Sequence, residues 1–173
     1  MSSHLKPTVN EKDHVDGPAD AAIELVEYGD YQCPHCGAAY PVIKKIQETF
    51  GKQIRFVYRN FPLTEIHPAA MPAAIAAEAA GLQGKYWEMH DVIFENQQHL
   101  TTEGIFKLAQ QIGLDPEQFK MDIQREDLQA HVEYDFESGV RSGVNGTPSF
   151  FINGQKFDGG AEDVFEVLKE SGE

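Results

Sequence analysis

Hydrophobic and polar positions in the first sixty residues follow first a strand period, then a helix period, then a strand period again. A short run rich in β-forming residues at 22–28 predicts a buried strand. Residues 34–50 predict a helix that ends at Gly51 and is kinked at Pro41. Residues 53–59 alternate as a strand with one wetter face. Together these segments predict a βαβ unit with a right-handed crossover.

The pattern turns helical from about Thr64 to Ser142. An alanine-rich segment between Pro68 and Gly81 comes first, and Asp115 reads as the N-cap of a short later helix. Three further groups of residues recur at helical spacing and share one helical face within each group: Tyr86, Met89, His90, Ile93 and Phe94; Ile105, Leu108, Ala109 and Ile112; and Leu128, Val132, Phe136 and Val140. Because strand signals resume only after this block, residues 64–142 are predicted to be a helical insertion.

The last part of the chain predicts a hairpin and a closing helix. Residues 149–152 and 155–157 have strand character and are joined by Asn-Gly, a strong hairpin signal. Residues 161–169 place their apolar side chains on one helical face. The polar residues 1–19 are expected to form a flexible arm, and residues 20–173 a single domain. The fold class is therefore predicted to be α/β, with a central mixed sheet.

Composition narrows the possible partners. The formal net charge is −14, from 14 basic and 28 acidic residues, so binding to nucleic acid or to an anionic membrane is not expected. No run approaches the roughly 20 apolar residues of a membrane span, and the first residues lack the apolar core of a signal peptide. Because the sequence opens with Met1, a cytoplasmic location is expected. A periplasmic or other extracytoplasmic location would follow if a signal peptide had been removed.

The two cysteines of the chain, Cys33 and Cys36, are separated by Pro34 and His35. They lie where the first predicted strand gives way to a helix. Two thiols at this spacing can close a reversible disulfide. The partial positive charge of the helix N-terminus favours the thiolate of Cys33, and an imidazolium at His35 would add to it.

A metal site is the alternative interpretation of the cysteine pair. A structural zinc ion takes four ligands, and the chain has neither a second cysteine pair nor a His-Glu-x-x-His motif. A metal ion or cluster would then have to be shared by two subunits. Four other histidines are expected to be helix-start, core-edge or surface residues: His67, His90, His99 and His131.

Two motifs together carry a family resemblance. The run from Tyr31 to Cys36, combined with Gly-Thr-Pro before the apolar strand at 149–152, resembles the DsbA-like branch of the thioredoxin superfamily. The resemblance covers nearly the whole chain after about Val15. It implies a thioredoxin-like fold whose helical subdomain is inserted at about 64–142.

The resemblance also implies roles for individual residues. A cis peptide bond between Thr147 and Pro148 would lie beside Cys33 and leave the Thr147 backbone open to pair with a substrate strand. Glu27, six residues before Cys33, corresponds to a buried acid that relays protons to the second thiol. On the residues alone, the alternative is that Glu27 is a surface carboxylate on the other face of its strand. Tyr31, Gln32 and Pro34 are expected to form the rim that contacts substrate.

The function predicted from these features is thiol-disulfide exchange with protein or peptide substrates, without a cofactor. A mixed disulfide would form on Cys33 and be resolved by Cys36. An unidentified redox partner would restore the pair. Two other functions remain open, which are a metal- or cluster-bridged dimer through Cys33 and Cys36, and a peptide-binding or chaperone module without turnover.

Overall fold

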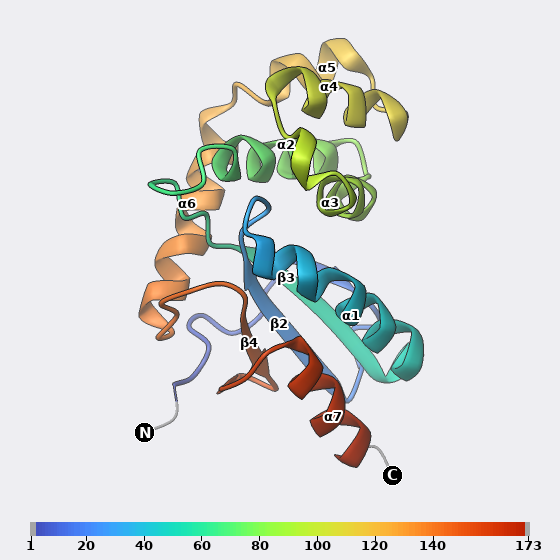
Figure 1. Cartoon of the computed structure of the whole chain (residues 1–173), viewed down its shortest axis with the longest axis vertical. Helices are drawn as coiled ribbons and strands as arrows, with labels where there is room; N and C mark the ends of the chain where they lie inside the picture. Colours follow the sequence, from blue (N-terminus) through green and yellow to red (C-terminus); the bar gives the residue numbers. More distant parts are fainter. Residues whose placement is uncertain (1–2, 172–173) are drawn as a thin grey trace.

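A five-stranded mixed sheet lies at the centre of the computed structural model, which describes residues 3–171 (Figure 1). The strand order is β1-β3-β2-β4-β5. β2 and β3 are parallel, and the other neighbouring pairs are antiparallel. The strands are β1 (His14–Asp16), β2 (Ile23–Gly29), β3 (Ile54–Asn60), β4 (Ser149–Ile152) and β5 (Gln155–Phe157).

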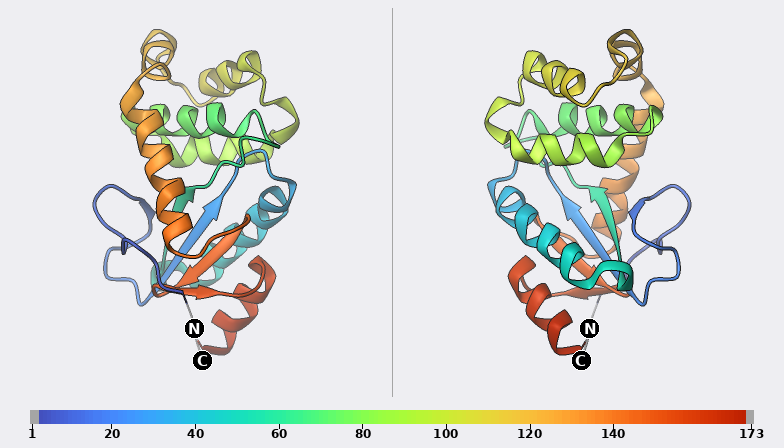
Figure 2. Two further views of the ribbon diagram at one scale, coloured as in Figure 1. Left: turned by 90° about the vertical axis from the view of Figure 1, so that its left-hand side faces the viewer. Right: turned by 90° about the vertical axis from the view of Figure 1, so that its right-hand side faces the viewer.

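Helices cover both faces of the sheet and one of its ends. α1 (Pro34–Phe50) and α7 (Ala161–Ser171) lie against one face, and α6 (Glu126–Arg141) lies against the other (Figure 2). The remaining helices gather beyond the end of the sheet to which β2 and β3 point (Figure 1). They are α2 (Ala70–Leu82), α3 (Tyr86–Glu95), α4 (Thr102–Gln111) and α5 (Pro116–Asp122), with short 3₁₀ turns at Gly51–Gln53 and Gln97–His99. The predicted α/β class, mixed sheet and helical insertion are confirmed.

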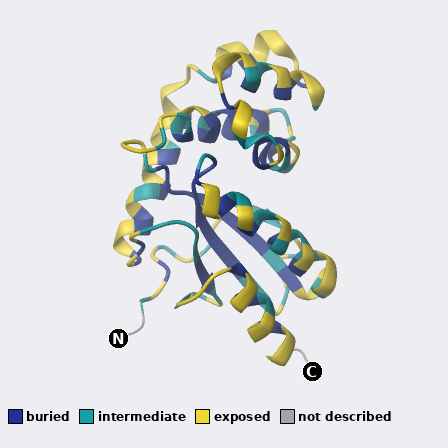
Figure 3. Cartoon of the chain, viewed as in Figure 1, coloured by how far each residue is buried: buried dark blue, intermediate teal, exposed yellow. Residues whose placement is uncertain are grey.

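Alternation along β2 divides its side chains between two apolar clusters. Leu25 packs into the core beneath α1 and α7, whereas Val26 and Tyr28 belong to the smaller cluster on the opposite face. Because side chains alternate along a strand, Glu27 shares the face of Leu25. The inner strands are buried on both faces, and the outer sides of α1 and α7 are exposed (Figure 3). The sheet therefore presents Glu27 to the helix that carries Cys36.

The predicted wetter face of β3 is largely absent. Arg59 is only 2% exposed, although its position suggested contact with water. Its guanidinium donates to both carboxylate oxygens of Asp13, at 2.8 and 2.9 Å, and to the hydroxyl of Tyr28 at 2.9 Å. The expectation was wrong because the segment that covers this face lies more than forty residues earlier in the chain.

The arm expected over residues 1–19 contains a strand that the pattern did not predict. β1 pairs with β3, with His14 opposite Tyr58. Leu5 is 4% exposed, and its backbone N–H donates to the carbonyl of Gly154 at 2.8 Å. The segment expected to be a flexible arm therefore contributes a short strand at residues 14–16, and its flexibility stays a prediction. A strand of three residues is too short to show a period, and it forms because the edge of β3 offers unpaired backbone groups.

The face of α6 that packs on the sheet differs from the predicted one at its C-terminal end. Leu128 and Val132 are buried as expected, but Val140 is 56% exposed. A spacing of four residues exceeds the 3.6-residue helical turn, so successive members drift around the helix. Ser138 and Gly139 are buried instead.

Gly139→Ala should destabilise the fold although alanine favours helices. A Cβ atom at this position would lie 2.6 Å from the ring of buried Phe61 and 3.1 Å from Tyr28. We expect a net loss of about 1–2 kcal/mol in the free energy of unfolding, since overpacking outweighs the helix-propensity gain. Chemical denaturation would measure it, with the exposed Glu133→Ala on the same helix as control. Equal stability of the two variants would contradict this packing.

Candidate active site

Cys33 and Cys36 lie at the junction of β2 and α1, as the sequence predicts. Cys33 is the N-cap of α1 with an extended backbone, and Pro34 is the first helical residue. Cys36 lies within the first turn and is fully buried. Both cysteines are free thiols in this structure. The junction therefore places one sulfur at the helix N-terminus and the other beneath it.

The environment of Cys33 favours its thiolate. A hydrogen bond with the Cys36 side chain contributes most to lowering the pKa of Cys33, which falls to about 5. Contact with Thr147 and with the backbone amides of Cys36 and His35 lowers the pKa further, whereas burial opposes these effects. Because the thiolate is the nucleophile in disulfide exchange, Cys33 is prepared for attack at neutral pH.

The environment of Cys36 has the opposite effect. Burial raises the pKa of its thiol far above the ordinary value, and the hydrogen bond with Cys33 and the charge of Glu27 raise it further. The backbone N–H of Asp30 donates to the Cys36 sulfur at 3.4 Å. Within one helical turn, the structure therefore holds one thiol that ionises readily and one that stays protonated.

Glu27 is buried, with 3% of its surface exposed, so the surface-carboxylate alternative is wrong. Burial raises the pKa of Glu27 to about 8, and the charge of Cys33 makes a smaller contribution in the same direction. Its Oε2 atom has no hydrogen-bond partner among the residues that the structure describes. A protonated carboxyl on this face of β2 can exchange a proton near neutral pH.

The second motif meets the first across the sheet end. The peptide bond between Thr147 and Pro148 is cis, as expected. The Cys33 sulfur lies 3.8 Å from the Thr147 carbonyl oxygen, although 114 residues separate them. An open groove of about 480 Å³ begins here and is lined by His35, Thr147, Pro148, Glu162 and Asp163 among others. Cys33 itself is 4% exposed, so its sulfur lies just beneath the edge of this groove, next to Thr147.

The predicted rim residues divide into exposed and buried ones. Pro34 and His35 are exposed, and half-buried Gln32 accepts a hydrogen bond from the backbone of Ala69 at 2.8 Å. Tyr31 is 1% exposed, and its hydroxyl lies 2.9 Å from Nδ1 of His90. The helical insertion thus covers the ring of Tyr31, and contact of this residue with substrate stays a prediction. The imidazole contribution of His35 to thiolate stability stays a prediction.

Asp30 and His67 are site residues that the sequence reading missed. Asp30 is 1% exposed, and one of its carboxylate oxygens accepts from the backbone N–H groups of Gln32 at 2.8 Å and Cys33 at 3.1 Å. The other oxygen accepts from Leu63 N–H at 2.9 Å and pairs with His67 Nδ1 at 2.8 Å. An Asp before a turn is a recognisable local signal. No local sequence signal indicates that Asp30 pairs with His67.

Gln97 also holds the active-site loop. Its side-chain amide donates to the backbone carbonyls of Tyr31 and Cys33, both at 2.9 Å. Gln97 belongs to the 3₁₀ turn after α3, so the helical insertion fixes the backbone on which the reactive sulfur is mounted. No sequence signal marks this contact, which spans more than sixty residues.

The comparisons with known proteins agree with this geometry. Residues 9–170 match the family described as thioredoxin. A thioredoxin-like oxidoreductase from Silicibacter pomeroyi superposes with a TM-score of 0.82 at 27% identity, covering 94% of this chain and 93% of that one. BdbD from Bacillus subtilis gives a TM-score of 0.84 at 24% identity over 99% and 95% of the two chains.

A curated relative is a much longer protein. The sodium/proton antiporter NhaA 1 of Salinispora arenicola is 40% identical over 155 residues, which are 90% of this chain and 24% of the antiporter. The chain thus spans about a quarter of that relative's length. Among residues 3–171, no helix combines the length and apolar character needed to cross a bilayer.

The chain belongs to the thioredoxin family, because the family match extends over nearly its whole length. The thioredoxin-like fold implied by the two motifs is confirmed by the family match and by the superposed structures, and the cis bond before Pro148 is observed.

Glu27→Gln should change how stability depends on pH. Folded Glu27 keeps its proton up to pH about 8, whereas the unfolded chain loses it near the ordinary value of 4.5. The wild type therefore loses free energy of unfolding as pH rises through this window, whereas the glutamine variant has no such term. The variant should gain a few kcal/mol relative to wild type between pH about 4.5 and about 8.

Urea unfolding across this pH range would measure the effect. Both proteins should carry Cys33→Ser, so that the thiolate does not titrate in the same window. The exposed Glu133→Gln serves as control and should show no such gain. A stability difference that stays constant with pH would mean that Glu27 ionises normally in the folded chain.

Proposed function

We propose that this thioredoxin-family chain is a thiol-disulfide oxidoreductase that exchanges disulfides with protein substrates through a mixed disulfide on Cys33. The observation that carries the proposal is the opposed ionisation of two thiols in contact. The pKa of Cys33 is lowered to about 5, while burial holds that of Cys36 far above its ordinary value. A metal-binding pair would need both sulfurs as thiolates.

In the oxidising direction the enzyme begins with a Cys33–Cys36 disulfide. A substrate thiolate attacks the Cys33 sulfur, the bond to Cys36 breaks, and Cys36 leaves with the electron pair and takes up a proton. A second substrate thiolate then attacks the substrate sulfur of the mixed disulfide. Cys33 leaves as a stable thiolate, the substrate holds a disulfide, and two electrons have passed to the enzyme.

In the reducing direction the same steps run backwards. The Cys33 thiolate attacks a substrate disulfide, and one substrate sulfur leaves as a thiolate. Cys36 must then lose its proton before it can attack Cys33 and release the second substrate thiolate. Glu27 is the carboxyl that shares the face of β2 toward α1, and its pKa of about 8 suits proton exchange with a buried thiol.

The groove beside the cysteines suits an extended polypeptide. Thr147 brings its backbone next to the reactive sulfur, so a substrate strand could pair with it while its own sulfur approaches Cys33. Pro148, His35 and Ala161 line the floor, and Glu162 and Asp163 add negative charge at one side. Segments with a cysteine near a basic residue would complement this charge.

The low pKa of Cys33 favours the oxidising direction. A stabilised thiolate lowers the free energy of the reduced enzyme and so makes the disulfide a stronger oxidant. A disulfide donor of this kind works where the glutathione pool does not keep it reduced. We therefore place its activity in an oxidising compartment, with a redox partner that reoxidises the pair.

Cys36→Ser should accumulate mixed disulfides, whereas Cys33→Ser should form none. The first variant keeps the nucleophile but removes the resolving thiol, so a covalent complex with a disulfide-containing peptide should persist. Mass spectrometry after non-reducing separation would locate the bond. Trapping on Cys36 in the Cys33→Ser variant would invert the assigned roles, and binding of the peptide without any covalent adduct would favour the chaperone alternative.

The redox equilibrium of the pair should lie well above the cytosolic glutathione poise of about −220 to −260 mV. A glutathione series followed by alkylation and mass measurement would give the potential. His35→Ala should lower it, if the imidazole adds to thiolate stability as the sequence suggests. A wild-type potential at or below the cytosolic value would point to a reductase, and an absence of any redox response would refute the exchange function.

A further inference from the structure

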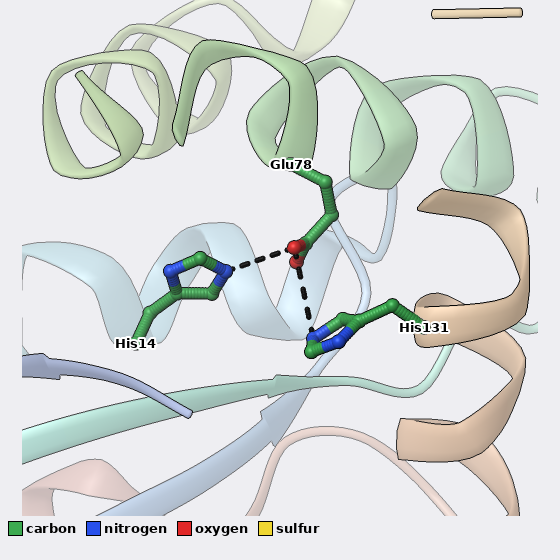
Figure 4. Close-up of side chains that lie close together, drawn as sticks. All are labelled: His14, Glu78 and His131. Carbon is green, nitrogen blue, oxygen red and sulfur yellow. Dashed lines mark hydrogen bonds and ion pairs between the residues drawn. The ribbon is translucent and has the colours of Figure 1, made fainter. Parts of the chain in front are cut away.

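A second cluster of reactive side chains lies away from the cysteines. His14 of β1, Glu78 of α2 and His131 of α6 turn toward one another (Figure 4). Nε2 of His14 lies 2.9 Å from Oε1 of Glu78, and Nε2 of His131 lies 3.6 Å from the same oxygen. Each of the three residues lies more than fifty positions along the chain from the next one. Their meeting is therefore a product of the tertiary fold.

The geometry of this cluster suits a metal ion. One ligand atom from each residue can be chosen so that all lie within 4.8 Å of one another. Zinc bonds of 2.0–2.1 Å in a tetrahedron place neighbouring ligand atoms about 3.4 Å apart. The distances of 2.9 and 3.6 Å bracket this value. The histidines are about a quarter exposed, so a hydrated ion can reach the cluster.

The charge around the cluster also calls for a cation. Asp135 is buried next to it, with Oδ2 at 3.6 Å from Nε2 of His131, and Glu78 is buried as well. Two buried carboxyl groups therefore lie beside the two imidazoles. Burying unpaired charges is costly, and one divalent ion would balance both.

Neighbouring residues fix the orientation of the Glu78 carboxylate and of the His14 ring, as outer-shell residues do for metal ligands. The side-chain amide of Asn60 donates to Oε2 of Glu78 at 3.2 Å and to Oδ2 of Asp135 at 3.0 Å. The bond to Oε2 leaves Oε1 of Glu78 directed at the histidines. The ring of His14 stacks on Tyr86 at 3.5 Å and 7°, which fixes its plane. Such second contacts commonly set ligand orientation and metal affinity.

We propose that His14, Glu78 and His131 bind a zinc ion. Two imidazoles and one carboxylate favour zinc over calcium or magnesium, which prefer oxygen ligands alone. The ion would fasten β1, and with it the N-terminal segment, to the helices α2 and α6 of the insertion. This site is separate from Cys33 and Cys36 and does not depend on the exchange function.

Zinc titration of the full chain carrying Cys33→Ser and Cys36→Ser would test the site, because thiolates could otherwise bind the metal. Isothermal titration should show one zinc per chain. Glu78→Gln and His131→Ala should each weaken binding at least about 100-fold, since loss of a direct ligand should cost no less than loss of a second-shell contact. As a control, replacement of the exposed His99 by alanine should leave zinc affinity equal to that of the parent, which is the chain that carries only Cys33→Ser and Cys36→Ser.

Two further readouts keep the result clear. Cobalt titration should give the visible absorption of a tetrahedral site in the parent and not in Glu78→Gln. Zinc should raise the midpoint of thermal unfolding of the parent by about 5 °C or more at a hundredfold excess over Kd, and leave Glu78→Gln unchanged. Absence of zinc binding by the Cys33→Ser, Cys36→Ser chain would overturn the proposal, and so would an unchanged zinc affinity in Glu78→Gln. Because glutamine keeps the shape of the glutamate side chain, this variant tests the site even where His131→Ala does not fold.

Discussion

The central constraint in this molecule is the placement of two thiols one helical turn apart in opposite environments. Cys33 ends β2 as the N-cap of α1, where backbone amides and a hydrogen bond with Cys36 favour the thiolate. Cys36 points into the core, where burial disfavours any charge. A βαβ unit supplies this arrangement, since its strand enters the core and its helix begins at the sheet end. The rest of the chain keeps that junction fixed.

Three distant segments hold the junction from different sides. Asp30 accepts hydrogen bonds from the backbone N–H groups of Gln32 and Cys33. Its other carboxylate oxygen pairs with His67, which precedes α2. Gln97 fastens the loop carbonyls from the far end of α3. Thr147 closes the remaining side, next to the Cys33 sulfur. The helical insertion is therefore part of the site's support, because two of the three anchors belong to it or lead into it.

Local signals explain what the sequence could predict. The periods of 22–28 and 34–50, the Asn-Gly turn and the two-cysteine spacing each lie within a few residues, and they placed the main strands, α1 and the reactive pair. The contacts that were missed join residues far apart in the chain. Arg59 is buried by a partner 46 residues away, and Tyr31 is covered by a helix 55 residues away. Propensity and period contain no information about such partners, so burial of polar side chains and the fit of β1 could not be predicted.

Buried acids at the junction between sheet and insertion illustrate the remaining physics. Asp30 accepts from three backbone N–H groups and pairs with His67, so it joins the active-site loop to the segment before α2. Glu27 has no such set of donors, and its pKa rises until the neutral form persists near neutral pH. Glu78 accepts from the side chain of Asn60 and lies beside both histidines, whereas Asp135 accepts from the side-chain and backbone N–H groups of Asn60 and lies beside His131. In a chain of net charge −14, these buried acids therefore differ in the hydrogen-bond donors that surround them. These differences support the proposals that Glu27 exchanges a proton with Cys36 and that Glu78 binds a metal ion, whereas the hydrogen bonds of Asp30 fix the loop before α1.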